Sequence, residues 1–282
     1  MSTRHNNSFL NHTKQENADF YFLCNQITFN GSNSKMHQFD FKEYLDHISL
    51  DCVIFGFHEN QLKILLLQLK YSKEWALPGG FAEKEETLEE AARRTLKERT
   101  GLDNIFLKQF YVFSDPQRSK ENPAVKDLKE SGAVYNPAWF AQRFISVGFY
   151  ALVDYEKVTP APDYFSERCA WKPLEEIDTL MMDHRQILDK ALETLRLQLS
   201  HQPIGYNLLP EKFTMPELQK LYETILGKSL DRRNFQRKIL SYKILNKLDE
   251  RKKGGAYKAP YLYEFNLENY NKALTEGFSG SW

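Results

Sequence analysis

The segment from Gly80 to Leu102, GFAEKEETLEEAARRTLKERTGL, constrains the fold more than any other part of this 282-residue chain. Thr87 followed three residues later by Glu90 is a capping box, in which each side chain bonds the backbone amide of the other residue, so a helix should begin here. Gly101 suits the left-handed position that ends many helices. The sequence therefore predicts a charged helix between Thr87 and Gly101.

Apolar runs of strand length surround this helix. Their length and their aromatic and β-branched content are typical of strands. The runs are DCVIFGF (51–57), QLKILLLQLK (61–70), KQFYVF (108–113) and RFISVGFYALV (143–153). A second helix is expected over about 183–199. With 41% hydrophobic and 27% charged residues, the chain is not wholly disordered, and the pattern indicates an α+β fold.

The spacing within residues 80–102 resembles the Nudix box. That box reads Gly, five residues, Glu, seven residues, then Arg-Glu-apolar-x-Glu-Glu-x-Gly-apolar. Seven positions match without gaps: Gly80, Glu86, Arg94, Leu96, Glu98, Gly101 and Leu102. The resemblance covers about residues 45–200 and implies a Nudix α/β/α sandwich with a mixed sheet.

Two of the three metal-binding positions of the box have changed. In catalytic members of that family, carboxylates at helix positions i, i+3 and i+4 hold magnesium ions, but here these positions carry Thr95, Glu98 and Arg99. Arg99 puts a cation where metal would bind, and two unit charges about 4 Å apart repel by roughly 4 kcal/mol at an effective dielectric of about 20. We predict a Nudix domain that binds without cleaving, with no catalytic residues, metal or cofactor. The alternatives are a magnesium-dependent hydrolase of nucleoside diphosphate derivatives and a merely solvated charged helix.

The C-terminal part of the chain has the pattern of a helix pair followed by a hairpin. Thr214 and Glu217 form another capping box, and apolar residues then recur with helical spacing. Asp231 can cap the second helix, and two strand-like runs follow, joined through the basic, glycine-containing segment 251–255. This order of elements predicts a winged helix-turn-helix domain.

The second helix of that domain carries basic and amide side chains. From Pro203 onward the sequence holds 14 Lys or Arg against 9 Asp or Glu, a net charge of +5 in a chain whose total is zero. Arginine can contact guanine and asparagine can contact adenine, while the other cations serve phosphates. The predicted DNA-binding residues are Arg232, Arg233, Asn234, Arg237, Lys238, Arg251, Lys252 and Lys253. The alternatives are a helical cap or dimerisation domain with a solvated basic face, and an interaction module that does not bind DNA.

A degenerate Nudix box followed by PIGYNLLPEKFTMPELQKLYETILG and LDRRNFQRKIL resembles the Nudix-related transcriptional regulators of bacteria. The resemblance runs from about Leu50 to Phe265. It implies that the first domain senses a small molecule and that a dimer binds double-stranded operator DNA. One branch of that family senses ADP-ribose and related NAD metabolites, and another senses sugars such as L-arabinose. RTLKERTGL and DCVIFGF favour the sugar branch and a role in carbohydrate metabolism.

The same resemblance places the effector in the Nudix cleft. A sugar requires directional hydrogen bonds and an aromatic face, whereas a nucleotide diphosphate requires cations, which Arg99 and Arg143 could supply. The predicted effector-binding residues are Glu98, Phe113, Asp115, Arg118 and Arg143. For each of them an ordinary surface ion pair is the alternative.

These features divide the chain into a polar N-terminal tail (1–38), a Nudix-like effector-sensing domain (39–200) and a winged helix DNA-binding domain (201–282). No apolar run reaches the roughly 18 residues that a membrane span requires, and the tail lacks a signal-peptide stretch. The three scattered cysteines give no disulfide framework. We expect a cytoplasmic homodimer without membrane partners. The roles of the tail and of the long loop 114–142 stay open.

Overall fold

The computed structural model describes residues 41–103, 105–118, 120, 122, 137–199, 201–252 and 259–277. Three sequence predictions fall outside the described residues: the tail 1–38, most of the loop 114–142, and Lys253 with the glycine-containing tip of the wing. Within the described ranges, no helix is both long enough and apolar enough to cross a membrane.

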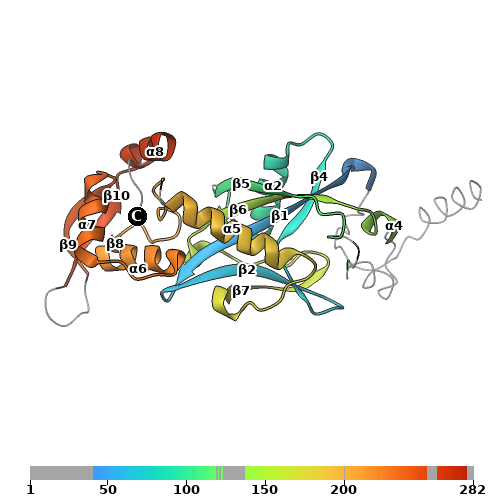
Figure 1. Ribbon diagram of the computed structural model, residues 1–282, viewed down its shortest axis with the longest axis horizontal. Coiled ribbons are helices and arrows are strands. Elements are labelled where there is room, and N and C mark those ends of the chain that lie inside the picture. The colour runs from blue at the N-terminus through green and yellow to red at the C-terminus, as the bar shows by residue number, and fades with distance from the viewer. Residues whose placement is uncertain are drawn as a thin grey trace, which may run out of the picture.

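A seven-stranded mixed sheet forms the larger part of the fold (Figure 1). Its strands are β1 (Tyr44–His58), β2 (Gln61–Leu69), β3 (Trp75–Ala76), β4 (Gly79–Glu83), β5 (Phe106–Phe113), β6 (Ile145–Leu152) and β7 (Ser166–Pro173). The main order is β3-β2-β1-β6-β5, with β4 paired to β1 and β7 paired to β2. β1 runs parallel to β6, and the other pairs are antiparallel.

Two helices cover the two faces of this sheet, α2 (Leu88–Thr100) and α5 (His184–Leu199). Successive side chains of a strand point to opposite faces. Accordingly, Leu50 and Ile54 of β1 pack in the core on the α2 side, whereas Val53 packs in the core on the α5 side. The result is the predicted Nudix sandwich. Its remaining short elements are η1 (Phe41–Glu43), α4 (Pro137–Phe140), η2 (Tyr155–Lys157) and η3 (Leu174–Glu176).

The predicted ends of α2 are confirmed. The Thr87 hydroxyl accepts the backbone N–H of Glu90 at 3.2 Å, and the Glu90 carboxylate accepts the backbone N–H of Thr87 at 2.8 Å. Gly101 ends the helix with a φ of 75°, which glycine adopts without steric cost. The four predicted strands are present as β1, β2, β5 and β6, although β1 begins earlier than expected, at Tyr44.

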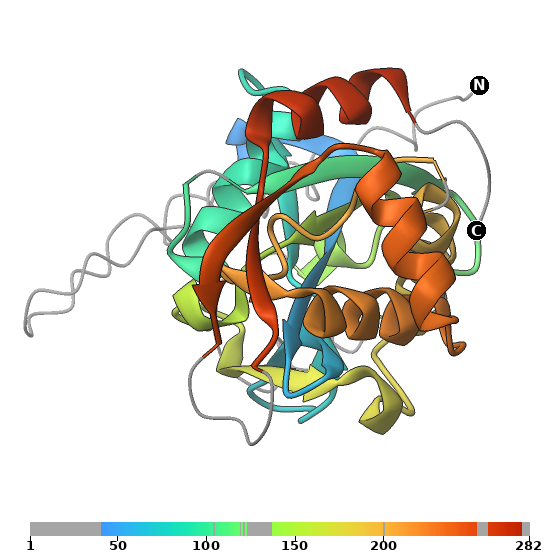
Figure 2. The same cartoon turned by 90° about the vertical axis from the view of Figure 1, so that its left-hand side faces the viewer.

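The C-terminal part forms the predicted winged helix at one end of the molecule (Figures 1 and 2). Its elements are β8 (Phe213–Thr214), α6 (Met215–Leu226), α7 (Arg232–Ser241), β9 (Leu245–Arg251), β10 (Tyr261–Phe265) and α8 (Leu267–Glu276). Thr214 caps α6 and Asp231 caps α7, as predicted. The strands form a three-stranded sheet in the order β8-β10-β9. α8 was not predicted from the sequence, and it lies on the opposite side of this domain from α6 (Figure 2).

The core on the α5 side of the sheet continues into the winged helix. Leu195 of α5 and Leu221 of α6 are fully buried members of one hydrophobic cluster. The Arg196 Nε also donates to the carbonyl oxygen of Ile225 in α6 at 2.7 Å. The two parts of the chain are therefore packed together through α5, and the exact domain boundary at residue 201 stays a prediction.

Candidate functional site

A cavity of about 310 Å³ lies between β4, the C-terminal half of α2 and the residues around the start of α5. It occupies the region where the sequence analysis placed the effector. Arg94, Thr95, Glu98 and Arg99 of α2 contribute its polar wall. The aromatic part of the wall consists of Tyr44, Phe81, Phe140, Phe144, Tyr164 and Phe165.

Two glycines allow β4 to pass close to its neighbours at this cavity. A Cβ atom at Gly79 would lie 2.5 Å from the carbonyl oxygen of Leu50, so no side chain fits there. A Cβ atom at Gly80 would lie 3.3 Å from the Thr95 Oγ1. Thr95 is only 2% exposed, and it is therefore confined beside the backbone of β4.

The metal-binding positions of the box do not fit a magnesium ion. Thr95 and Arg99 supply no carboxylate, and Glu98 accepts a hydrogen bond from the Arg99 Nη2 at 2.8 Å. The other Glu98 oxygen lies 3.9 Å from the Arg94 Nη1. Hard divalent cations take several oxygen ligands. No group of three or more His, Cys, Asp or Glu side chains is placed to hold a metal within the described part of the chain.

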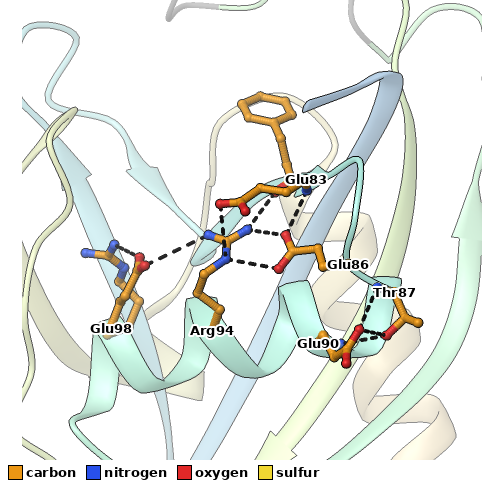
Figure 3. Close-up of polar contacts among 8 residues, drawn as sticks. Glu83, Glu86, Thr87, Glu90, Arg94 and Glu98 are labelled. Atoms are coloured by element: carbon orange, nitrogen blue, oxygen red, sulfur yellow. Dashed lines mark hydrogen bonds and ion pairs between the residues drawn. The ribbon is translucent and has the colours of Figure 1, made fainter. Parts of the chain in front are cut away.

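Arg94 organises the loop that precedes α2 (Figure 3). Its Nε donates to the Glu86 Oε2 at 3.2 Å, and its Nη2 donates to the carbonyl oxygen of Phe81 at 3.0 Å. Glu83 and Glu98 flank the guanidinium at 3.9 Å (Figure 3). Burial favours the neutral form of Glu86, but hydrogen bonds from Arg94 and from the backbone amide of Glu83 outweigh it. The pKa of Glu86 is therefore lowered.

Replacing Glu86 by glutamine should reduce stability in a pH-dependent way. Because the folded-state pKa of Glu86 lies below its unfolded value, the carboxylate contributes stability above the unfolded pKa, and this contribution is lost as the pH falls through the folded pKa. We expect Glu86→Gln to lower the free energy of unfolding by about 1.5–3 kcal/mol at neutral pH, as for hydrogen bonds to charged groups. The difference should shrink below about pH 4. Urea unfolding at neutral pH and near pH 3 measures both values, and equal losses at the two would contradict the charge argument.

A buried polar cluster that the sequence analysis missed adjoins the cavity. Asp51 lies 3.3 Å from the Arg118 Nη2 and 3.4 Å from the His184 Nε2. The Arg118 Nε donates to Asp183 at 2.8 Å, and the backbone N–H of Leu77 donates to the His184 Nδ1 at 2.9 Å. Because the Nδ1 accepts this bond, the proton of the neutral imidazole is assigned to the Nε2, which faces Asp51. The cluster joins β1, the segment after β5 and the start of α5.

Two of the five predicted effector contacts line the cavity, namely Glu98 and Arg118. The side chain of Arg118 is only 3% exposed, and its guanidinium is held by Asp51 and Asp183. Arg118 therefore has a structural role that the sequence analysis did not foresee. Glu98 is half-exposed and remains accessible to a ligand.

The other three predicted effector contacts do not line the cavity. Phe113, at the end of β5, is partly buried and packs against the core on the α5 side. The Asp115 carboxylate accepts the backbone N–H of Gln117 at 2.8 Å. Arg143 is exposed and donates to the carbonyl oxygen of Ser114 at 2.8 Å. All three residues lie beside the long loop. The side chain of Phe113 packs against the core, and those of Asp115 and Arg143 bond backbone groups instead of facing the cavity.

α7 presents the predicted recognition surface. Phe235 and Ile239 are buried and hold the helix against α6, which leaves the opposite side to solvent. The Arg237 Nη2 donates to the Asn234 Oδ1 at 2.9 Å, so these two side chains act together on one face. Burial lowers the pKa of Lys238. The exposed predicted DNA-binding residues of this helix are Arg232, Arg233, Asn234 and Arg237.

The predicted basic residues at the wing have partners of their own. The Arg251 guanidinium lies 4.1 Å from the centre of the Tyr261 ring, and its Nη2 donates to the Tyr261 hydroxyl at 2.7 Å. Lys252 is paired with Glu217 at the start of α6. A phosphate contact by Lys252 would therefore compete with this ion pair, which the sequence analysis did not anticipate.

Comparison with known proteins identifies both parts of the chain. Residues 45–193, more than half of the chain, match the NUDIX domain. The chain belongs to the Nudix family. Residues 205–265 match the NrtR DNA-binding winged helix domain. The Nudix sandwich and the winged helix predicted from the sequence are thus both confirmed.

Several known proteins are similar to all or part of this chain. This chain is 28% identical over 255 residues to the ADPR responsive transcriptional repressor NtrR of Acinetobacter baylyi. The match covers 87% of this chain and 93% of the relative. An ADP-ribose pyrophosphatase of Methanocaldococcus jannaschii is 39% identical over 82 residues, 28% of this chain and 48% of that one. Shewanella oneidensis NrtR complexed with a 27mer DNA superposes with a TM-score of 0.65 at 23% identity, covering 84% of this chain and 100% of that chain. A MutT/nudix family protein from Enterococcus faecalis gives a TM-score of 0.56 at 20% identity, over 93% and 100% of the two chains.

The expected sugar-sensing branch is not supported by these comparisons. The relative that matches along 87% of the chain is an ADPR-responsive repressor. The two segments on which the expectation rested contain buried positions, such as Cys52 and Val53 in β1 and Leu96 in α2. Packing selects such residues, so this part of the resemblance reflects the fold and not the ligand.

Proposed function

We propose that this Nudix protein is a transcriptional regulator that binds ADP-ribose, or a closely related nucleoside diphosphate ribose, and binds operator DNA through its winged helix. The observation that carries the proposal is the similarity to an ADPR responsive transcriptional repressor through 87% of the chain, in both domains. The effector is a nucleotide derivative rather than the sugar that the sequence analysis favoured.

The chemistry of the cavity supports a nucleotide ligand. Its aromatic wall suits the face of a base, and Arg99 supplies a cation for phosphate. The box positions do not fit magnesium, which supports binding without hydrolysis. The similarity to an archaeal ADP-ribose pyrophosphatase, confined to 28% of the chain, favours the hydrolase as the second candidate.

The winged helix is proposed to act as a dimer on a two-fold operator. The exposed face of α7 would enter the major groove, and the wing would lie along the backbone. Two recognition helices in such a dimer lie about 34–36 Å apart, or a multiple of this distance. Homodimerisation and the individual DNA contacts are parts of the proposal.

Replacing Arg233 and Arg237 by alanine should abolish selective DNA binding. Each arginine that contacts a base contributes about 1–3 kcal/mol of discrimination, and each lost phosphate contact lowers the salt slope by about one. Fluorescence anisotropy with DNA upstream of the protein's own gene and neighbouring operons measures the affinity. The double variant Arg93→Ala/Lys272→Ala, which also removes two positive charges but at exposed positions of α2 and α8, is the control and should bind like wild type. Selective binding that survives in the double variant would contradict the recognition role of α7.

The effector is tested in the same assay by adding ADP-ribose, with L-arabinose and D-xylose as comparisons. A shift of DNA affinity by ADP-ribose alone supports the proposal. Magnesium-dependent turnover of ADP-ribose, together with salt-sensitive binding that is alike on unrelated DNA, would instead establish the hydrolase with an accessory domain.

A further inference from the structure

Arg99 occupies the third metal-binding position of the Nudix box. Its side chain is 11% exposed and belongs to the cavity wall. The Nη2 donates to Glu98 at 2.8 Å, and the Nη1 donates to the carbonyl oxygen of Ala161 at 3.3 Å. The Nε is buried and has no hydrogen-bond partner among the described residues. A buried donor without a partner is unfavourable, and a bound anion would supply the missing acceptor.

The other two guanidiniums of the cavity wall are committed to buried or partly buried acids. Arg94 is held by Glu86, whose side chain is 15% exposed, and Arg118 is held by Asp51 and Asp183, whose side chains are 8% and 11% exposed. By contrast, the carboxylate bonded to Arg99 is that of Glu98, which is 48% exposed. Solvent-exposed ion pairs are weak. A phosphate can therefore displace Glu98 from Arg99 more easily than it can displace the partners of Arg94 or Arg118.

Asp163 adds a hydrogen-bond acceptor to the same cavity. Its segment is attached to the last turn of α2, because the backbone N–H of Ala161 donates to the carbonyl oxygen of Arg99 at 3.1 Å. Asp163 lines the cavity, and its Oδ1 is buried without a partner among the described residues. Such a carboxylate oxygen suits a ribose hydroxyl. A cation, an acceptor and an aromatic wall together fit a nucleoside diphosphate linked to a sugar.

We propose that the Arg99 guanidinium takes the place of magnesium in this Nudix box and binds the diphosphate of the effector directly. The inference rests on the proposed function and deepens it. The N–H groups of a guanidinium form a fork that matches phosphate oxygens, so Arg99 neutralises the diphosphate without a divalent ion. It does not activate water for attack as a bound metal does. Effector binding is therefore independent of divalent metal and leaves the diphosphate intact.

Isothermal titration of the full chain with ADP-ribose, in excess EDTA and in magnesium chloride, tests this assignment. Wild type should bind with the same Kd in both buffers, to within about twofold. Arg99→Gln should weaken binding by at least about tenfold, the scale of one charge-assisted hydrogen bond. Arg99→Lys keeps the charge but loses the forked N–H groups, so its Kd for ADP-ribose should lie between those of wild type and Arg99→Gln. The matched control is Arg93→Gln on the same helix, because Arg93 pairs with Glu89, and its variant should bind like wild type.

The possible outcomes separate this inference from the proposed function. A magnesium requirement for wild-type binding, or equal affinities of Arg99→Gln and Arg93→Gln, would overturn the role of Arg99 and leave ADP-ribose as the effector. If wild type binds no ADP-ribose in either buffer, both the role of Arg99 and the proposed function are contradicted. Adenosine lacks the diphosphate, so Arg99→Gln should leave its affinity unchanged, whereas a general distortion of the cavity would weaken it. If Arg99→Gln does not fold, the ADP-ribose affinities of Arg99→Lys and Arg93→Gln are compared. Weaker binding by Arg99→Lys supports the role of Arg99, and equal affinities contradict it.

Discussion

Replacing Arg118 by methionine is expected to lower the free energy of unfolding by about 3–5 kcal/mol, which is typical when one partner of a buried ion pair is removed. The Arg118 side chain is 3% exposed and lies between Asp51, 8% exposed, and Asp183, 11% exposed. Methionine retains much of the apolar volume but leaves two buried carboxylates without their cation. Urea unfolding of wild type and variant measures the loss.

Arg93→Met makes the same chemical change at an exposed site and is the control. Arg93 is 46% exposed and pairs with Glu89 one turn earlier on α2. Exposed pairs of this kind contribute about 0–1 kcal/mol, so the control should lose no more than that.

A triple variant tests the cause of the Arg118 effect. Adding Asp51→Asn and Asp183→Asn to Arg118→Met removes both uncompensated charges, so part of the lost stability should return. If Arg118→Met loses no more than Arg93→Met, or if the triple variant recovers nothing, the unpaired charges are not responsible.

The ends of the helices could be predicted because they depend on residues that are neighbours in the sequence. Thr87 with Glu90, and Thr214 with Glu217, satisfy backbone amides within one turn. By contrast, β7 has a largely polar sequence, SERCAWKP, and is a strand because it pairs along β2. Only the partner strand identifies it.

The buried cluster around Asp51 could not be assembled from the sequence. Its members come from three separate segments, and Ser146 of β6 also donates to Asp51. A signal was nevertheless present, because Asp51 opens the otherwise apolar run 51–57. A buried carboxylate requires a partner. His184, at the start of an expected helix, was a candidate for that partner.

In the candidate effector site, too, the residues set by local spacing could be predicted from the sequence, whereas those that depend on strand pairing could not. The box spacing alone identified Glu98 and Arg99, because residues three and four positions apart share a helix face. Arg143 was chosen because it flanks the long loop, and Phe113 because it offers an aromatic face. Their side chains take part in local contacts that depend on how β5 and β6 pair.

The Arg196→Ala substitution is expected to reduce the effect of ADP-ribose on DNA affinity. α5 carries His184, which lines the cavity, at one end and Arg196, which bonds the α6 carbonyl of Ile225, near the other. At about 1.5 Å per residue, the helix spans roughly 24 Å between the candidate effector cavity and the winged helix. The Arg196 guanidinium also lies at the negative end of the α6 dipole, so it fixes α6 relative to α5.

The expected size of the effect follows from linkage. In the wild type, effector coupling of about 1–3 kcal/mol corresponds to a change of roughly 5–150-fold in DNA affinity. Arg196→Ala should reduce this ratio severalfold, because part of the rigid connection is lost while the cavity and the exposed face of α7 keep their residues. The ratio is measured by anisotropy with and without saturating ADP-ribose, together with the ADP-ribose Kd of the isolated variant.

Lys190→Ala is the matched control, because Lys190 is a partly exposed cation in the middle of α5 that pairs with Glu193 and does not contact α6 through that pair. Lys190→Ala should keep the wild-type ratio of DNA affinities with and without ADP-ribose. An Arg196→Ala variant with an undiminished ratio would show that coupling does not pass through this bond. The contact between the Thr224 hydroxyl and the carbonyl oxygen of Asn60, which joins α6 to the β1–β2 turn at 3.3 Å, would then be the next connection between the domains to remove.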